Sequence, residues 1–152
     1  MFEIVKHIDF CFGHRLIDYH GKCNQPHGHN GRVEIHLASA ALDAFGMVAD
    51  FREVRHTVTA WIDANWDHRM ILRRDDPLAD AITALGQAAF LMDENPTTEN
   101  LARLLYATVA EFGLPVVAVT LWETPDSYAT YRPTPIGQRA SDGATVAHAE
   151  RR

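Results

Sequence analysis

Long apolar runs and clustered positive charge are both missing from this sequence. No apolar stretch approaches the roughly 20 residues that a helix needs to span a bilayer. The formal net charge is −6 and no Lys/Arg cluster stands out, which argues against nucleic acid or an anionic membrane as the main partner. The N-terminal segment "MFEIVKHIDF" lacks the apolar block of a signal peptide. We therefore expect a cytoplasmic protein with no nucleic-acid or membrane partner.

Cysteine is scarce, and internal repeats are absent. Cys11 and Cys23 are the two cysteines, and two free thiols are the expected state in a reducing compartment. No repeat is visible at periods of 20–50 residues. What is present is a globular composition, 47% apolar and 22% charged, in 152 residues, which is enough for one domain with a core. Nine histidines are a high count for this length and favour a metal site.

Hydrophobic periodicity predicts four strands and two main helices. Alternating apolar residues predict strands at 2–12, 32–42, 116–123 and 128–133. Asp50 is a good N-cap, with Glu53 completing a capping-box-like pattern, and the apolar stripe of that helix fades at Asn65. A second long helix begins after Pro96, where Thr97 or Thr98 can cap it, and stops at Gly113 and Pro115. Residues 66–72 are interpreted as a link, and a short helix is expected near 77–85.

These elements follow one another in the order β-β-α-α-β-β. Strands joined by hairpins are antiparallel, so the fold class is α+β, a four-stranded antiparallel sheet with two helices on one face. The outer strands of such a sheet have open edges, which invites closure through other subunits. We expect one domain over residues 1–134. The tail at 135–152 is polar and rich in small residues, and we expect it to be disordered.

The segment "CNQPHGHN" at 23–30 contains the strongest metal-ligand pattern. Residues i and i+2 of an extended chain point the same way, so His27 and His29 are predicted to lie side by side. His14, at the end of the first strand, is the best third ligand, and His20 is its rival. Three neutral imidazoles with one open position are typical of a catalytic zinc site, whereas structural sites usually have four ligands.

The two thiols allow different interpretations. Cys23 either completes a closed Cys-His-His-His site or stays off the metal and acts as a base or nucleophile, because a nearby cationic centre favours the thiolate. Cys11 lies between Phe10 and Phe12 in a strand, which favours an inert structural role.

Two acidic residues, Asp67 and Glu123, are further candidates for a functional role. Asp67 and His68 form an acid–imidazole relay if the backbone bends, and otherwise they are a solvated pair at a helix exit. Glu123 continues the apolar row of Val117, Val119 and Leu121. It therefore lies either at the rim of the sheet in water or buried with donors, where it would suit a ligand with two N–H groups.

Several separated segments together resemble one family. "FCFGHRL", "CNQPHGHN", "WDHRMIL", "NPTTENLA" and "WETPDSYATY" have the order and spacing of the 6-pyruvoyltetrahydropterin synthase and 6-carboxytetrahydropterin synthase family. The resemblance covers about residues 2–132. It implies the tunnelling fold, in which trimers close a barrel from their sheets and two trimers stack into a homohexamer with active sites between subunits.

The resemblance also implies a set of site residues. The zinc ligands of the family correspond to His14, His27 and His29, and its catalytic cysteine corresponds to Cys23. Its Asp–His pair corresponds to Asp67 and His68. The glutamate that anchors the pterin corresponds to Glu123, and Thr97 and Thr98 fall where the family lines the pterin pocket. The chain departs from the family at Cys11-Phe12-Gly13 and at Trp66, which replaces a smaller aliphatic residue.

The implied activity is that of a lyase that uses Zn²⁺. The Cys-x-x-x-His-Gly-His spacing resembles the bacterial branch that converts 7,8-dihydroneopterin triphosphate to 6-carboxy-5,6,7,8-tetrahydropterin, acetaldehyde and triphosphate, a step toward 7-deazaguanines such as queuosine. One alternative is a 6-pyruvoyltetrahydropterin synthase, which eliminates triphosphate without releasing acetaldehyde. Another is a non-catalytic module that binds zinc or a pterin.

Overall fold

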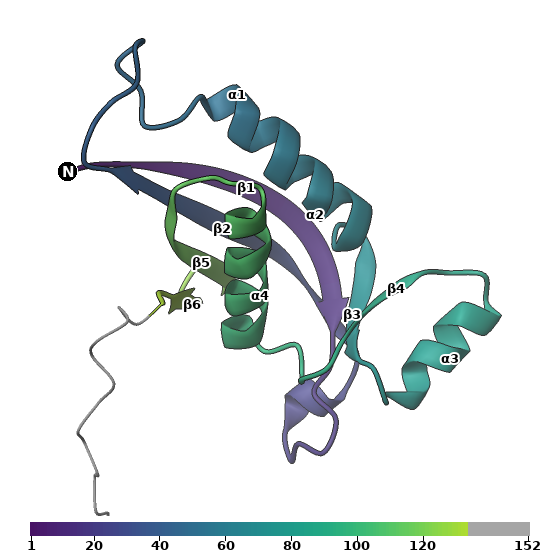
Figure 1. Cartoon of the computed structure of the whole chain (residues 1–152). Helices are drawn as coiled ribbons and strands as arrows, with labels where there is room; N and C mark the ends of the chain where they lie inside the picture. Colours follow the sequence, from purple (N-terminus) through teal and green to yellow (C-terminus); the bar gives the residue numbers. More distant parts are fainter. Residues whose placement is uncertain (134–152) are drawn as a thin grey trace, which may run out of the picture.

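A sheet with helices against one of its faces makes up the part of the chain that the computed structural model describes, residues 1–133 (Figure 1). The tail predicted at 135–152 lies outside the described residues. The strands are β1 Phe2–His14, β2 His27–Ser39, β3 Arg69–Arg73, β4 Ala89–Met92, β5 Val116–Thr124 and β6 Ser127–Tyr131. The helical elements are η1 Lys22–Asn24, α1 Phe51–Val54, η2 Arg55–Thr59, α2 Ala60–Asn65, α3 Pro77–Ala84 and α4 Thr98–Glu111.

The sheet corrects the predicted four-stranded antiparallel arrangement. It has six strands in the order β4-β3-β1-β2-β5-β6. The run from β1 through β2 and β5 to β6 is antiparallel, as predicted. Strands β3 and β4 add to the β1 edge in parallel, so the α+β class holds and the sheet is mixed. The segment interpreted as a link contains β3 because its short apolar centre, Ile71 and Leu72, is fully buried, and burial on both faces leaves no alternation to detect.

The second strand also starts earlier than predicted, at His27. Its pairing with β1 runs from Phe2 opposite Ser39 to His14 opposite His27. The glycines in this segment resemble turn signals, but here they allow close packing. A Cβ atom at Gly31 would lie 2.8 Å from the ring of Phe12. The HGH segment is therefore part of a regular strand.

The predicted helices are confirmed, including their caps. Asp50 accepts a hydrogen bond from the Arg52 N–H, and the helix continues through α1, the π-helical segment η2 and α2. Thr97 caps α4 by accepting from the Asn100 N–H. The chain leaves α4 at Gly113, whose φ of 78° is the left-handed conformation that glycine adopts at low cost. None of the helices among residues 1–133 is long and apolar enough to cross a bilayer.

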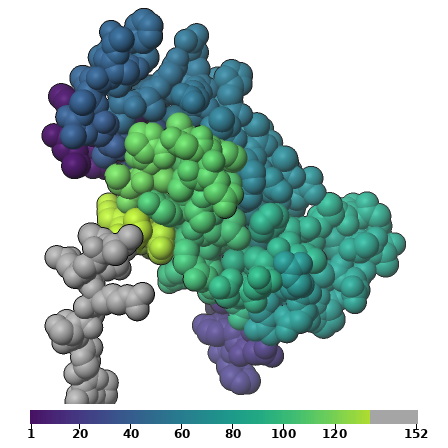
Figure 2. Space-filling model, viewed as in Figure 1, coloured from purple at the N-terminus to yellow at the C-terminus, as the bar shows by residue number. Residues whose placement is uncertain are grey.

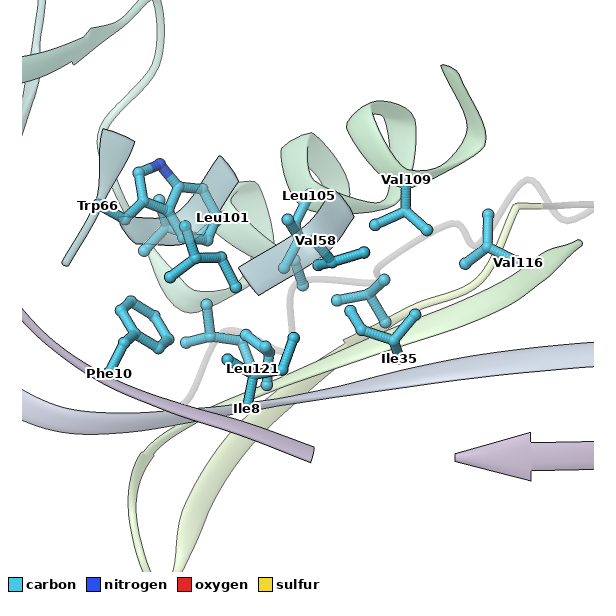
Figure 3. Packing of buried hydrophobic residues seen from close by; sticks show 14 of the residues in the cluster. Ile8, Phe10, Ile35, Val58, Trp66, Leu101, Leu105, Val109, Val116 and Leu121 are labelled. Atoms are coloured by element: carbon cyan, nitrogen blue, oxygen red, sulfur yellow. The ribbon is translucent and has the colours of Figure 1, made fainter. Parts of the chain in front are cut away.

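The core lies between the sheet and the two long helical segments. Side chains of the strands, such as Ile8 and Leu121, meet Val58 from η2 and Leu105 from α4 (Figure 3). Trp66 is fully buried at one end of this core, its ring 5.9 Å from that of Phe10. Among the described residues, Trp66 Nε1 is the buried side-chain polar atom that lacks a hydrogen-bond partner, which typically costs about 1–3 kcal/mol.

This packing gives the sheet two different faces. The covered face carries Phe10, Phe12 and His14 from β1, and all three are buried. Their neighbours Asp9 and Cys11 point to the other side, which we call the open face. Figure 1 shows the helices against the covered face, and Figure 2 shows the loop that follows β1 projecting from the body of the molecule.

Candidate functional site

The histidines singled out in the sequence meet at the end of the β1–β2 pair that lies away from the N-terminus (Figure 1). His14 is the last residue of β1, and His27 and His29 open β2. The Nε2 atom of His14 lies 3.1 Å from Nε2 of His27 and 3.2 Å from Nε2 of His29. These three nitrogens form a group that could hold a metal ion. We call it the histidine triad.

Backbone carbonyls orient two of the three imidazoles in the histidine triad. Nδ1–H of His14 donates to the Pro96 carbonyl and Nδ1–H of His27 donates to the Gln25 carbonyl, each at 2.8 Å. Because a carbonyl can only accept, both rings carry their proton on Nδ1 and present a lone pair at Nε2. Two such lone pairs facing each other at 3.1 Å repel unless a cation lies between them.

The electrostatics of the triad also suit a metal. Burial lowers the pKa of His14, although the Pro96 carbonyl and Glu123 act in the opposite direction. Burial likewise lowers the pKa of His29. Both rings are therefore neutral near pH 7, the form that binds metal. Two Zn²⁺-bound nitrogens are typically separated by about 3.3 Å, so the donor set and its spacing fit such an ion.

Glu123 lies beside the triad. It is the penultimate residue of β5, and its Oε1 is 3.7 Å from Nε2 of His14. Its side chain is 22% exposed, so the carboxylate is neither at a solvated rim nor fully buried. One anionic oxygen therefore faces the triad while the side chain remains accessible to a ligand.

Cys23 lies in the loop between the first two histidines, on the short 3-10 turn η1. Its carbonyl accepts a hydrogen bond from the Leu16 N–H at 2.8 Å, which draws the turn toward the end of β1. Its side chain is half-buried. Neither Cys23 nor His20 belongs to the group of donor atoms formed by the triad.

The segment before α4 supports this loop, a contribution that sequence reasoning missed. The Asn95 side chain accepts from the Ile17 N–H at 3.1 Å and donates to the Ile17 carbonyl at 2.8 Å. The next residue, Pro96, holds His14. Thr97 and Thr98 follow directly, one as the cap of α4 and the other as its first residue. No sequence signal beyond the proximity to a helix start marks Asn95.

Asp67 and His68 form an acid–imidazole pair. Nδ1–H of His68 donates to Oδ2 of Asp67 at 2.8 Å. The bend that the pair requires is present, because His68 has a φ of 56°. Burial opposes ionisation of Asp67, but hydrogen bonds from the Cys11 N–H and from His68 outweigh it and lower the pKa of Asp67. Asp67 is therefore ionised near pH 7, and its hydrogen bond fixes the orientation of the His68 ring.

Cys11 is more exposed to ligands than the sequence suggested. It is only half-buried, and its Sγ donates to Oδ1 of Asn30 at 3.2 Å across the open face. A cavity of about 670 Å³ is lined by Cys11, His68, His27 and His29, and a neighbouring cavity of about 820 Å³ is lined by Cys11, Asp67 and His68. The inert structural role predicted for Cys11 stays a prediction, although its thiol lines both cavities. The parity signal was present, since Phe10 and Phe12 point to the covered face.

Comparison with known proteins assigns the chain to a family. Residues 3–134 match the profile of the family described as 6-pyruvoyl tetrahydropterin synthase. The chain belongs to this family. A relative from Rickettsia conorii, named 6-carboxy-5,6,7,8-tetrahydropterin synthase, is 35% identical over 84% of this chain and 98% of its own length. A Rickettsia typhi protein of the same name is 41% identical over 67% of this chain and 75% of its own.

Solved structures share the fold of this chain. An uncharacterized protein from Wolinella succinogenes superimposes with a TM-score of 0.71 at 27% identity, covering 88% of this chain and 98% of that one. The Caenorhabditis elegans 6-pyruvoyl tetrahydropterin synthase superimposes with a TM-score of 0.65 at 22% identity, covering 88% and 96%. The latter likeness concerns the fold.

Proposed function

We propose that the chain is a lyase that converts 7,8-dihydroneopterin triphosphate to 6-carboxy-5,6,7,8-tetrahydropterin, acetaldehyde and triphosphate, in 7-deazaguanine biosynthesis. The observation that carries the proposal is the triad of converging Nε2 atoms beside Glu123, in a chain 35% identical to a synthase of that name over nearly its whole length. We assign the catalytic unit to residues 1–134 and the enzyme to the cytoplasm.

His14, His27 and His29 would hold the metal ion, which we propose is Zn²⁺. When bound there, Zn²⁺ supplies Lewis acidity that lowers the pKa of hydroxyl and C–H groups on the substrate side chain. The contribution of the protein is to aim the Nε2 atoms of the three imidazoles at one point. Pro96 and Gln25 do this through the Nδ1–H groups of His14 and His27.

Glu123 would orient the substrate. An ionised carboxylate accepts two hydrogen bonds from adjacent N–H groups, which is the edge that the pyrimidine ring and amino group of a pterin present. The position of Glu123 beside His14 would keep the reacting side chain of the substrate close to the triad. Thr97 and Thr98 would line the same pocket, since they follow the carbonyl that holds His14.

Proton transfer would use two groups. Cys23, held beside the end of β1 but outside the donor group of the triad, would act as a thiolate that takes or relays a proton. His68 would serve the opposite acid or base role through its Nε2, because its Nδ1–H is bonded to Asp67. Its side chain is 78% exposed, so a substrate can reach it.

We propose that the active site is completed between subunits of a homohexamer with the tunnelling fold. Within one chain, the triad and Glu123 lie on the covered side of the sheet, while Asp67 and His68 meet Cys11 on the open side. The two groups of donor atoms are separate. His68 lines one cavity with His27 and His29 within a single chain, but the resemblance to the family implies active sites between subunits, so we propose that a substrate held by one triad meets the Asp–His pair of a neighbouring subunit. The edge strands β4 and β6 offer unpaired backbone groups for such an assembly.

The proposal is tested by incubating the purified protein with dihydroneopterin triphosphate and identifying the products by mass spectrometry. Carboxytetrahydropterin together with acetaldehyde is the expected result. A pyruvoyl product would instead make the chain a 6-pyruvoyltetrahydropterin synthase. Metal or pterin binding without turnover would make it a binding module and would overturn the proposal.

A further inference from the structure

The loop between β1 and β2, residues 15–26, carries Cys23 and is fixed at its start. Each of its first four residues is bonded to another residue, in the pairs Arg15–Asp76, Leu16–Cys23, Ile17–Asn95 and Asp18–Arg73. Three of the partners lie outside the loop: at the end of β3, directly before α3 and shortly before α4. The start of the loop is therefore attached to the body of the molecule. We call residues 15–18 the loop base.

Among these attachments, the Asn95 side chain acts most directly on the backbone of the loop base. It accepts from the Ile17 N–H at 3.1 Å and donates to the Ile17 carbonyl at 2.8 Å, so it satisfies both backbone groups of one residue. The ion pair of Asp18 with Arg73 contributes less, because the Asp18 side chain is 78% exposed and water screens the pair. Asp18 nevertheless has a φ of 60°, a costly conformation that its surroundings must maintain. Asn95 holds the residue directly before it.

Asn95 is itself held in place by the start of α4. Its carbonyl accepts from the Thr97 N–H at 2.7 Å and from the Asn100 side chain at 2.9 Å. The carbonyl of the next residue, Pro96, accepts from Nδ1–H of His14. Two consecutive residues therefore hold the loop that carries the thiol and the most buried histidine of the triad.

The attachment at Ile17 reaches Cys23 through one further bond. The N–H of the preceding residue, Leu16, donates to the Cys23 carbonyl at 2.8 Å. On the other side of Cys23, the Gln25 carbonyl accepts from Nδ1–H of His27. The short turn that carries the thiol is thus bonded to the loop base on one side and to the triad on the other, and its position depends on both.

We propose that Asn95 is a positioning residue that sets the place of the Cys23 thiol relative to the histidine triad, acting through Ile17 and Leu16. The inference rests on the proposed function only for the role of Cys23 in proton transfer. A group that transfers protons must lie within hydrogen-bond reach of its target. A misplacement of about 1 Å can cost about 100-fold in rate.

Hydrogen exchange of the full-length protein tests the attachment without any measurement of activity. We expect Asn95→Ala to raise amide exchange at least about tenfold over residues 15–18 and also over 22–25, measured by mass spectrometry after short labelling times. The second segment decides the proposal, because a purely local contact would release the Ile17 N–H and leave the turn at Cys23 unchanged. Asn65→Ala is the matched control. It also loses a side-chain bond to a backbone carbonyl, within α2, and should leave both segments at wild-type rates.

Kinetics and metal content on the same samples show whether the displaced turn matters for the reaction. In Asn95→Ala, kcat should fall about 10–100-fold while KM stays near wild type, because the substrate still binds but the thiol is misplaced. Zinc per chain should match the wild type, since the three histidines lie on β1 and β2. Loss of zinc would show that Asn95 acts on the triad instead and would contradict the proposal.

A second variant, Asn95→Asp, keeps the outcome clear if Asn95→Ala folds poorly. Its carboxylate retains the shape of the side chain and the acceptor for the Ile17 N–H, but it cannot donate to the Ile17 carbonyl. Exchange over residues 22–25 should therefore rise in the same direction. Wild-type exchange over that segment in whichever variants fold would overturn the proposal. If the wild type shows no turnover, the proposed lyase activity fails, and the exchange rates still decide whether Asn95 holds the loop.

Discussion

The two sides of the sheet hold histidines in contrasting ways. On the covered side, His14 is 3% exposed, and a backbone carbonyl fixes its tautomer. On the open side, His68 is 78% exposed and is bound at Nδ1 to a carboxylate. The first arrangement keeps an imidazole neutral and immobile, as a metal ligand must be. The second orients the ring through Nδ1 and leaves Nε2 accessible to a ligand, as an acid or base requires.

The largest expected effect comes from removing a histidine of the covered side. His27→Ala should lose the metal of the triad and lower turnover at least about 1,000-fold, because several kcal/mol of Lewis-acid stabilisation disappear. Metal analysis and product formation measure this. His20→Ala, in the same loop, is the control and should leave both values near wild type. A His27→Ala enzyme with full activity would exclude the triad as the reaction centre.

The second-largest effect is expected from removing the thiol of Cys23. Cys23→Ala should reduce turnover by about 10²–10⁴-fold, the range of general acid–base catalysis, while the metal of the triad stays bound. Turnover and metal content are measured on the same sample. If the triad loses its metal in this variant, Cys23 is a ligand and the separation of thiol and metal is wrong.

On the open side, Asp67→Asn should lower kcat by about 100-fold, because the carboxylate that orients the His68 ring is lost. The metal content of the triad should not change, since Asp67 lies outside that group. A comparison of kcat with KM separates this effect from a structural one: kcat should fall while KM stays near the wild-type value. A variant whose kcat equals that of the wild type would argue against a role in proton transfer.

A stability effect is also expected next to the histidine triad. Arg15, the neighbour of His14, donates from Nε to the buried Asp76 at 2.8 Å, and Asp76 also caps α3. Asp76→Ala should therefore cost about 3 kcal/mol, or about 10 °C in Tm. The exposed Asp75→Ala is the control. Equal Tm values for the two variants would show that the ion pair is unimportant.

The stability lost in Asp76→Ala should depend on pH, and the direction follows from the lowered pKa of Asp76. Burial opposes ionisation of Asp76, but Arg15 and the Leu78 N–H lower its pKa below the unfolded value. A lowered folded pKa contributes stability above the unfolded pKa of about 3.9 and loses it as pH falls through the folded value. The difference in Tm between wild type and Asp76→Ala should thus be full at pH 6 and shrink below about pH 4.

The smallest expected effect is the pH dependence of stability that comes from the imidazoles of the covered side. The pKa values of His14 and His29 are lowered by burial, so the unfolded chain binds more protons just below its histidine pKa of about 6.5. The chelator-treated protein should therefore lose stability as pH falls from about 6.5, by linkage. Thermal unfolding at several pH values checks this. A Tm that rises on acidification over that interval would contradict neutral, buried histidines.

Local patterns were enough to predict most of the elements of this fold. The caps at Asp50 and Thr97 act through hydrogen bonds to residues two or three positions away, so the sequence alone reveals them. The side-by-side placement of His27 and His29 follows from strand geometry in the same way. Strand β3 could not be predicted, because a five-residue strand buried on both faces has no alternation and pairs only with distant residues.

By itself, the sequence determined the family, the α+β class and the chemistry available at CNQPHGHN, because these depend on residue types and on short, local spacings. Only the tertiary structure decided which donors meet. The β1–β2 register brings His14 to His27, Pro96 fixes the tautomer of His14 from across the chain, and the turn at His68 docks on Cys11. These contacts join residues far apart in the chain, and packing rather than local propensity selects them.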